Sequence, residues 1–165
     1  MNLIYILFSP KGRIGPKDFW RGIIILIGFQ IVSGVLTLYG PVFIALLLSF
    51  ISFFIIYPYY CVFGKRLHDA GKSSWMFLLF MIGYIVILMV IILISPGFMD
   101  ALSQYMEYSE AGDLEAAQVM MERINSDYAL NQFGATIIAN FALGFLAARL
   151  SSHPGPNQYG PPTGQ

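Results

Sequence analysis

Long uncharged stretches dominate the pattern of apolar and polar positions along the chain. Between Gly22 and Gly64 the sequence runs 43 residues without an Asp, Glu, Lys, Arg or His, and nearly all of these residues are apolar or small. A helix rises about 1.5 Å per residue and the hydrocarbon core of a bilayer is roughly 30 Å thick, so one span needs about 20 residues. The stretch therefore predicts two membrane spans, over about 22–39 and 42–63, with a turn at 39–41.

A second uncharged block, from Ser73 to Met99, predicts a third span over about 75–95. A fourth candidate, over about 133–150, is uncharged until Arg149 but is diluted by glycine and weakly polar residues. Its free energy of insertion per residue is therefore less favourable than that of the other three. We include it as a span.

The segment between the third and fourth spans, 96–132, carries seven acidic residues and is rich in Ala, Glu, Met and Gln, which favour helices. Asp113 is placed to cap a helix that runs to about Ser126. The predicted fold class is therefore all-α: a polytopic membrane protein with four transmembrane helices and a helical, acidic extracytoplasmic loop.

Residues 1–150 are expected to form a single four-helix transmembrane domain. Residues 151–165 contain four Pro and three Gly, so we expect them to form an extended cytoplasmic tail. The composition agrees with a membrane protein, since 57% of the residues are apolar and 11% are charged, against roughly 25% charged residues in soluble domains. Nine basic and nine acidic residues give zero net charge, which argues against binding to nucleic acid.

The basic residues predict the orientation, because Lys and Arg in short loops are held on the cytoplasmic side during insertion. Eight of the nine lie before the first span, between the second and third, or at the end of the fourth. The ninth, Arg123, shares segment 96–132 with the acidic residues. We therefore expect both ends of the chain in the cytoplasm.

The loop from Gly64 to Trp75 is the densest polar cluster in the chain. Gly71 suits the left-handed residue that ends a helix, and Ser73 or Ser74 suits the cap that begins the next one. His68 beside Asp69 could bind a metal or relay a proton, but the chain has one other histidine, so we expect no metal site. An ion pair of Asp69 with Arg13 or Arg66 is the favoured interpretation, and it would lock the cytoplasmic helix ends together.

Trp20 and Trp75 are both expected at the inner membrane interface, where amphipathic rings anchor helices at the headgroups. The alternative is a pocket for an anionic lipid headgroup, formed where the basic and aromatic segment before Trp20 meets the loop that contains Lys72. Both interpretations stay open at this point.

Within the fourth span, weakly polar and small residues recur every four positions and share one helix face; they are Thr136, Asn140, Gly144 and Ala148. Such residues let helices approach closely and hydrogen-bond across the contact, so we expect packing there, with a substrate path as the alternative. Pro58 is expected to kink the second span.

Three stretches of the chain together resemble the signature of a known family. They are Gly12-Arg13-Ile14 followed by Phe19-Trp20, then Arg66-Leu67-His68-Asp69 through Gly71-Lys72-Ser73 to Trp75, then Asn157-Gln158-Tyr159-Gly160-Pro161. The sequence resembles the YhaH-like small bacterial inner-membrane proteins, domain-of-unknown-function family 805. The resemblance implies a four-helix protein of the bacterial cytoplasmic (inner) membrane without an established activity.

With the orientation inferred above, all three stretches would lie on the cytoplasmic side. We expect them to form one cluster at the inner mouth of the bundle, with five polar members: Arg13, Arg66, His68, Asp69 and Asn157.

The favoured function is that of a non-enzymatic integral inner-membrane protein. Its polar cluster would act as a structural clasp and as a candidate site for an anionic lipid or a protein partner. The residues named for this site are Arg13, Trp20, Arg66, His68, Asp69, Lys72, Trp75 and Asn157. Membrane lipids, a second copy of the chain or another membrane protein are the candidate partners, and no cofactor or metal is expected.

Two other functions are considered. The first is a small oligomeric transporter or channel, for which a coupled pump is disfavoured because no predicted span holds an ionisable residue at mid-membrane. The second is a membrane enzyme with His68 as general base, which would need a nucleophile or a metal that the sequence does not offer.

Overall fold

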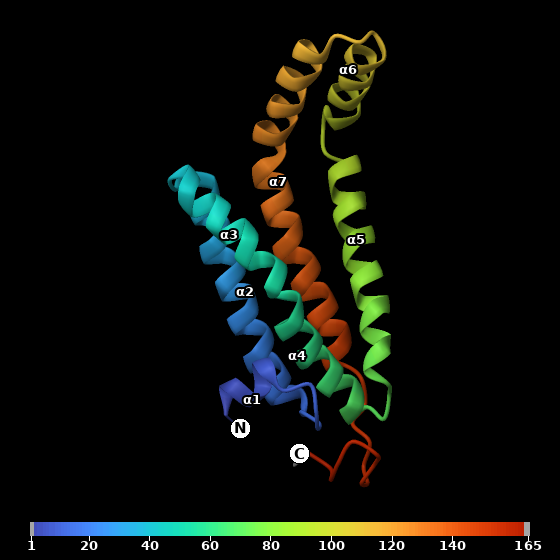
Figure 1. Ribbon diagram of the computed structural model, residues 1–165. Coiled ribbons are helices and arrows are strands. Elements are labelled where there is room, and N and C mark those ends of the chain that lie inside the picture. Colours follow the sequence, from blue (N-terminus) through green and yellow to red (C-terminus); the bar gives the residue numbers. More distant parts are fainter. Residues whose placement is uncertain (1, 164–165) are drawn as a thin grey trace. The chain divides into compact units, whose positions relative to one another are not determined.

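The structure is a computed structural model that describes residues 2–163; Met1 and the last two residues of the expected tail, 164–165, lie outside the described residues. The described chain is helical apart from its turns and one isolated bridge between Asn157 and Gly160. Figure 1 labels the α-helices: α1 (Leu3–Phe8), α2 (Pro16–Tyr39), α3 (Val42–Phe54), α4 (Ile56–Asp69), α5 (Phe77–Leu93), α6 (Phe98–Glu110) and α7 (Leu114–Ala148). The short 3₁₀ helix η1 (Ser74–Met76) comes between α4 and α5.

Within residues 2–163, four helical stretches are long and apolar enough to cross a membrane: Pro16–Tyr39, Val42–Asp69, Ser74–Leu93 and Leu114–Ala148. The expected all-α fold with four helices of transmembrane length and composition is therefore confirmed. Helices of this length satisfy all their interior backbone hydrogen bonds within the segment, which a bilayer requires.

The side chains of these helices are exposed in the way that a lipid environment demands. In α5, Phe77 is the buried residue, while Leu79, Ile82 and Met89 are each more than half exposed. A helix that is apolar on every side would expose a large, aggregation-prone apolar surface in water, but in a bilayer the same surface is solvated by acyl chains. The exposed apolar surface therefore agrees with a multi-pass membrane protein.

The first predicted span lies within a longer helix. α2 begins at Pro16, well before the predicted start at 22, because the fixed φ of proline suits the first turn of a helix and its missing N–H has no partner there. The predicted turn is confirmed, since α2 ends at Tyr39 and α3 begins at Val42.

The second predicted span, 42–63, is two helices. Pro58 cannot donate a backbone hydrogen bond, and the helix is interrupted just before it, at Ile55, whose N–H bonds to Ser52 instead of Ile51. The expected distortion is therefore confirmed as a break between α3 and α4. α4 then runs to Asp69, past the predicted end at 63.

The turn after α4 has the predicted chemistry. Gly71 has a φ of +72°, and its N–H bonds to the carbonyl of His68 while Lys72 bonds back to Leu67 (2.8 Å). This is the double hydrogen bond of a Schellman cap, which needs a left-handed residue at Gly71. Ser73 then accepts a hydrogen bond from the N–H of Trp75 and caps η1, so the third helical stretch begins at Ser74 rather than 75 and ends at Leu93 rather than 95.

The prediction for the last helices was wrong in one respect. Asp113 does cap a helix, accepting a hydrogen bond from the N–H of Ala116 (3.0 Å), but that helix does not stop near Ser126. It continues as α7 through the predicted span 133–150 to Ala148, because residues 127–132 contain neither Pro nor Gly to interrupt the hydrogen-bond ladder.

The contacts divide the chain into two compact units, residues 1–83 with 140–165, and residues 84–139. The second unit is the acidic segment with the adjoining ends of α5 and α7. Within it, the Tyr128 hydroxyl donates to the carbonyl of Pro96 (2.9 Å) and its ring packs edge-on against Phe98. The expected single domain over residues 1–150 stays a prediction.

The first unit contains the tightly packed core. The short helix α1, which the sequence did not predict, packs on α2 and α4 and buries Ile6 completely. A Cβ atom on Gly22 would lie 2.9 Å from Ile6 and 3.0 Å from Val62, so only glycine allows these helices to approach so closely. Phe19 and Leu67 are also fully buried, and this core supports the polar cluster at the end of α4.

The face of α7 with small residues packs against α2 within the same unit. The Asn140 amide donates to the Gln30 side chain (2.8 Å), and Tyr59 of α4 donates to the same Gln30 oxygen. A Cβ atom on Gly144 would lie 3.3 Å from Ile23. The expected helix packing is thus confirmed at Asn140 and Gly144.

Candidate functional site

The carboxylate of Asp69, at the last residue of α4, is completely buried and accepts five hydrogen bonds. Oδ1 accepts from Arg13 Nε (3.2 Å), Arg13 Nη2 (3.1 Å) and Thr163 Oγ1 (2.6 Å). Oδ2 accepts from Arg66 Nη1 (2.6 Å) and Ser152 Oγ (2.5 Å). We call these five residues, Arg13, Arg66, Asp69, Ser152 and Thr163, the Asp69 clasp.

Arg13 joins three separate segments of the chain. It lies in the connection between α1 and α2, and its guanidinium is almost fully buried. Besides Asp69, it donates to the tail carbonyls of His153 (2.7 Å), Gly155 (2.9 Å) and Gly160 (3.3 Å). Since buried charges are stable only when paired and hydrogen-bonded, Arg13 holds the tail against the end of α4.

Arg66 pairs with Asp69 within one turn of α4 and also reaches the end of α7. Its guanidinium donates to the carbonyls of Ala148 (3.1 Å), the last residue of α7, and of Leu150, two residues further on. These carbonyls are the unpaired acceptors at the negative end of the helix dipole, so a cation is stabilised there. Among the buried polar side-chain atoms of the described chain, Arg66 Nε lacks a hydrogen-bond partner.

The charges explain why both arginines are needed. The Asp69 carboxylate neutralises one of the two guanidinium groups, and the backbone carbonyls around Arg13 and Arg66 compensate the remaining positive charge. Removing the single carboxylate would leave two buried cations facing each other, which is strongly unfavourable.

Lys65 makes a second buried link that the sequence analysis missed. Its ammonium group, on a fully buried side chain, donates to the carbonyls of Tyr5 and Ile6 (2.8 Å) near the end of α1, and lies 4.5 Å from the centre of the Tyr5 ring. Lys65 therefore caps the carboxyl end of α1. Neighbouring residues 65 and 66 thus fix the ends of two different helices, α1 and α7.

His68 is enclosed rather than open to a substrate. Its Nδ1 donates to the carbonyl of Gly12 (3.0 Å), and its ring stacks on Tyr159, with 3.7 Å between the ring centres and 7° between the planes. Asn157 donates to the backbone carbonyl of His68 (2.9 Å). The structure therefore brings together the five expected polar members, although His68 and Asn157 contact the rim of the clasp and not the Asp69 carboxylate.

Three of the predicted site residues lie away from the clasp. Trp20 packs beside Gly144 on α7, Lys72 is exposed, and Trp75 is 76% exposed at the start of the third helical stretch. Among the described residues, no group of three or more His, Cys, Asp or Glu side chains is arranged to hold a metal ion.

Two tail residues of the clasp, Ser152 and Thr163, were not predicted from the sequence. Ser152 and Thr163 both bond to Asp69, and the N–H of His153 donates to the Asp69 carbonyl (2.7 Å). The expected tail is irregular, as predicted from its Pro and Gly content, but residues 151–163 are fixed by these bonds instead of running free.

The comparisons with known proteins point to one family. The sequence model of the family described as "Protein of unknown function (DUF805)" matches residues 7–109. Two relatives, both named "Uncharacterized protein YiiR", come from Escherichia coli K12 and Escherichia coli O157:H7. Each is 40% identical over 84 residues, which cover 48% of this chain and 54% of the relative. The chain thus spans about half the length of these curated relatives, and no solved structure matches it.

The matched region contains Arg13, Lys65, Arg66 and Asp69, the charged centre of the site, whereas the tail residues that bond to it lie outside the match. The narrower likeness to YhaH-like proteins stays a prediction. Because the family model covers more than half of the sequence, the chain belongs to the DUF805 family of proteins of unknown function.

Proposed function

We propose that this chain is a non-enzymatic integral protein of the bacterial cytoplasmic (inner) membrane, with both ends of the described chain on the cytoplasmic side. In this proposal the Asp69 clasp is a structural lock that joins the segment before α2, the end of α4 and the tail. The basic residues around the clasp face anionic lipid headgroups.

The observation that carries the proposal is the saturation of the Asp69 carboxylate. One buried side chain receives five hydrogen bonds from four residues in three segments that are far apart in the sequence. A catalytic carboxylate needs an open side for its substrate. A carboxylate without one is better suited to holding segments together.

The His68 side chain also supports a structural role. A general base must reach the proton it removes, within about 3 Å or through one water. The Nδ1 atom of His68 is engaged by Gly12, and Tyr159 covers one face of its ring. Its neighbour Asp69 is paired with two arginines, so the adjacent His and Asp side chains do not form a free dyad.

The burial of the arginines revises the lipid proposal made from the sequence. Arg13 and Arg66 are too deeply buried to contact a headgroup. The exposed basic side chains Lys17, Lys72 and Arg149 are available instead. Each exposed Lys or Arg near an anionic membrane surface adds about 1 kcal/mol of attraction.

The orientation can be tested with a membrane-impermeant maleimide on intact cells. The native Cys61 is buried and stays unreactive, so the chain can carry one reporter cysteine at an exposed position. We expect Glu115→Cys to react in intact cells and Lys72→Cys to react only after the cells are permeabilised. The reverse pattern would overturn the proposed orientation.

The lock can be tested by hydrogen–deuterium exchange of the tail in lipid nanodiscs. With Asp69→Asn, the amides of residues 151–163 should exchange at least tenfold faster, because the amide removes the negative charge that pairs with Arg13 and Arg66 and replaces one of the two acceptor oxygens by a donor NH2 group. Asp127→Asn, which removes the acid of the exposed Arg123–Asp127 pair, is the matched control and should leave the tail unchanged. Equal tail protection in the wild type and Asp69→Asn would overturn the structural lock.

A further inference from the structure

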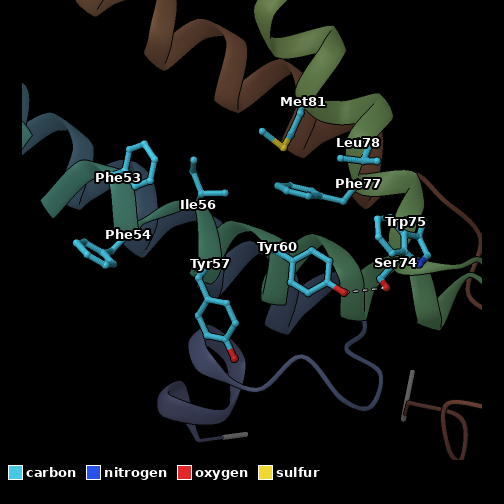
Figure 2. Close-up of a pocket in the computed structure, with 10 residues that line it drawn as sticks. All are labelled: Phe53, Phe54, Ile56, Tyr57, Tyr60, Ser74, Trp75, Phe77, Leu78 and Met81. Atoms are coloured by element: carbon cyan, nitrogen blue, oxygen red, sulfur yellow. Dashed lines mark hydrogen bonds between the residues drawn. The ribbon is translucent and has the colours of Figure 1, made fainter. Parts of the chain in front are cut away.

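A second feature of the first unit is an apolar groove that the clasp does not explain. It has a volume of about 530 Å³ and lies where the break between α3 and α4 faces η1 and the start of α5. Figure 2 shows the ten side chains that line it. They are Phe53, Phe54, Ile56, Tyr57, Tyr60, Ser74, Trp75, Phe77, Leu78 and Met81.

The groove is apolar along nearly its whole length and has a pair of hydroxyl groups at one end. Phe53 and Phe54 lie at one end, while Ser74 and Trp75 lie at the other (Figure 2). At this polar end the hydroxyls of Tyr60 and Ser74 are 3.1 Å apart and share a hydrogen bond. A ligand that fits the groove is therefore apolar over most of its length and polar at one end.

The groove follows from the sequence of the second span. Because Pro58 interrupts the helix at Ile55, the chain changes from α3 to α4 beside Phe53, Phe54 and Ile56. The opposite wall begins at Ser74 and Trp75, which the tight turn at Gly71 places next to the end of α4. Both walls belong to helical stretches of membrane-spanning length, so the groove opens into a lipid environment.

A free cation lies next to the polar end in the sequence. Lys72 is exposed and comes two residues before Ser74. Within residues 2–163 its ammonium group forms no ion pair, unlike the guanidinium groups of the arginines that pair with Asp18, Asp69 and Asp127. An ammonium group without an ion pair and two hydroxyls, brought within a few residues of each other by one tight turn, are the chemistry that binds a phosphate group.

We propose that this groove is a specific binding site for an anionic phospholipid of the surrounding bilayer. One acyl chain lies along Phe53, Phe54 and Leu78, and the phosphate lies beside Lys72 and the Tyr60–Ser74 hydroxyls. The volume falls within the roughly 300–1,000 Å³ of small-molecule sites. The inference rests on the proposed function, because it needs the Lys72 side of the protein at a membrane surface with anionic lipid.

Occupancy of the groove can be measured by native mass spectrometry of protein released from vesicles of equal parts phosphatidylglycerol and phosphatidylcholine. The wild type should retain one phospholipid, with phosphatidylglycerol at least threefold in excess. Leu78→Trp fills the groove and should lower retention at least fivefold. Leu79→Trp is the matched control, since Leu79 is the next residue of α5 and does not line the groove, and it should retain lipid like the wild type.

Two results of this measurement would overturn the site. One is equal lipid retention by the Leu78→Trp and Leu79→Trp variants. The other is a dimer that only Leu78→Trp abolishes, which would show that a second copy of the chain fills the groove.

A fluorescence measurement tests the site without a groove-filling substitution. The chain has two tryptophans, so the Trp20→Phe variant leaves Trp75 at the rim as the single emitter. Phosphatidylglycerol with brominated acyl chains should quench Trp75 at least twofold more than brominated phosphatidylcholine at the same mole fraction. Lys72→Gln should remove this difference and Lys17→Gln should keep it. Equal quenching by the two lipids in the Trp20→Phe protein would contradict the proposal.

The failure of this inference is distinguishable from that of the proposed function. If Glu115→Cys and Lys72→Cys are labelled as expected but the groove variants do not change lipid retention, the orientation stands and only the lipid site in the groove is contradicted. If Lys72→Cys is labelled in intact cells, the orientation fails first and the groove site fails with it.

Discussion

Arg66 and Asp69, one helical turn apart on α4, form a buried ion pair with 2.6 Å between Arg66 Nη1 and Asp69 Oδ2. The same guanidinium also bonds to the carbonyls of Ala148, the last residue of α7, and of Leu150 just after it. The ion pair on α4 therefore also fixes the end of α7, more than 75 residues later in the sequence. This double role leads to the first prediction.

Arg66→Gln should lower the free energy of unfolding by about 3–5 kcal/mol, because it leaves the Asp69 carboxylate partly unpaired and the α7 carbonyls without their donor. Arg66→Lys should recover less than half of the loss, since an ammonium group cannot reproduce the planar set of donors. The control is Arg149→Gln, at an exposed arginine directly after α7, and it should change the free energy of unfolding by less than about 0.5 kcal/mol. Reversible unfolding in mixed micelles measures all three, and full rescue by lysine would contradict the bridging role.

Lys65→Met should detach α1 without unfolding the spans. The carbonyls of Tyr5 and Ile6 would lose their buried donor, at a cost of about 1–3 kcal/mol. Hydrogen–deuterium exchange of residues 3–8 should accelerate markedly while that of α5 stays unchanged. Lys72→Met, at an exposed lysine in the following turn, is the control and should leave α1 protected.

Gly71→Ala should destabilise the protein by about 1–2 kcal/mol, because alanine is strained at the left-handed φ of +72°. The matched change Gly134→Ala, within α7 and with open space around the new methyl group, should be neutral or stabilising by up to about 1 kcal/mol. Thermal unfolding of both variants provides the comparison, and a stabilising effect at Gly71 would show that the turn does not have this cap in the membrane.

Asn140→Leu should lower stability by about 0.6–1.7 kcal/mol through the loss of its hydrogen bond to Gln30 between α7 and α2. The double variant Asn140→Leu with Gln30→Leu should lose less stability than the sum of the two single losses, since both substitutions remove the same hydrogen bond. Strict additivity in this double-mutant cycle would mean that the two amides do not interact.

The spans were predictable because the bilayer sets a fixed length and a strong apolar bias. Gly71 was predictable for a similar reason, since the turn requires a left-handed backbone conformation, and the helix cap that follows was narrowed to Ser73 or Ser74 because a hydroxyl side chain suits it. The pairing of Asp69 with arginine also followed from the sequence, because a carboxylate among basic residues in an apolar chain needs a partner. Arg13 and Arg66 were predicted as alternative partners of Asp69, and in the structure both pair with it.

The remaining features depend on contacts that local patterns do not encode. The helix α1 is too short to be stable alone, and it forms because Ile6 and Lys65 attach it to the core. The continuity of α7 was not predicted, because the helix capped by Asp113 was expected to end near Ser126, although residues 127–132 contain neither Pro nor Gly to break it. The docking of Ser152 and Thr163 depends on hydrogen bonds to a residue more than 80 positions away.

The most direct measurement of the central claim is a double-mutant cycle between Arg13 and Asp69 in lipid nanodiscs. The free energies of unfolding of the wild type, Arg13→Gln, Asp69→Asn and the double variant are compared. If the clasp holds the chain ends together, the double variant should be at least about 1.5 kcal/mol more stable than the sum of the single effects implies. Additivity within about 0.5 kcal/mol would contradict the clasp, because it would show that the two side chains do not stabilise each other in the folded protein.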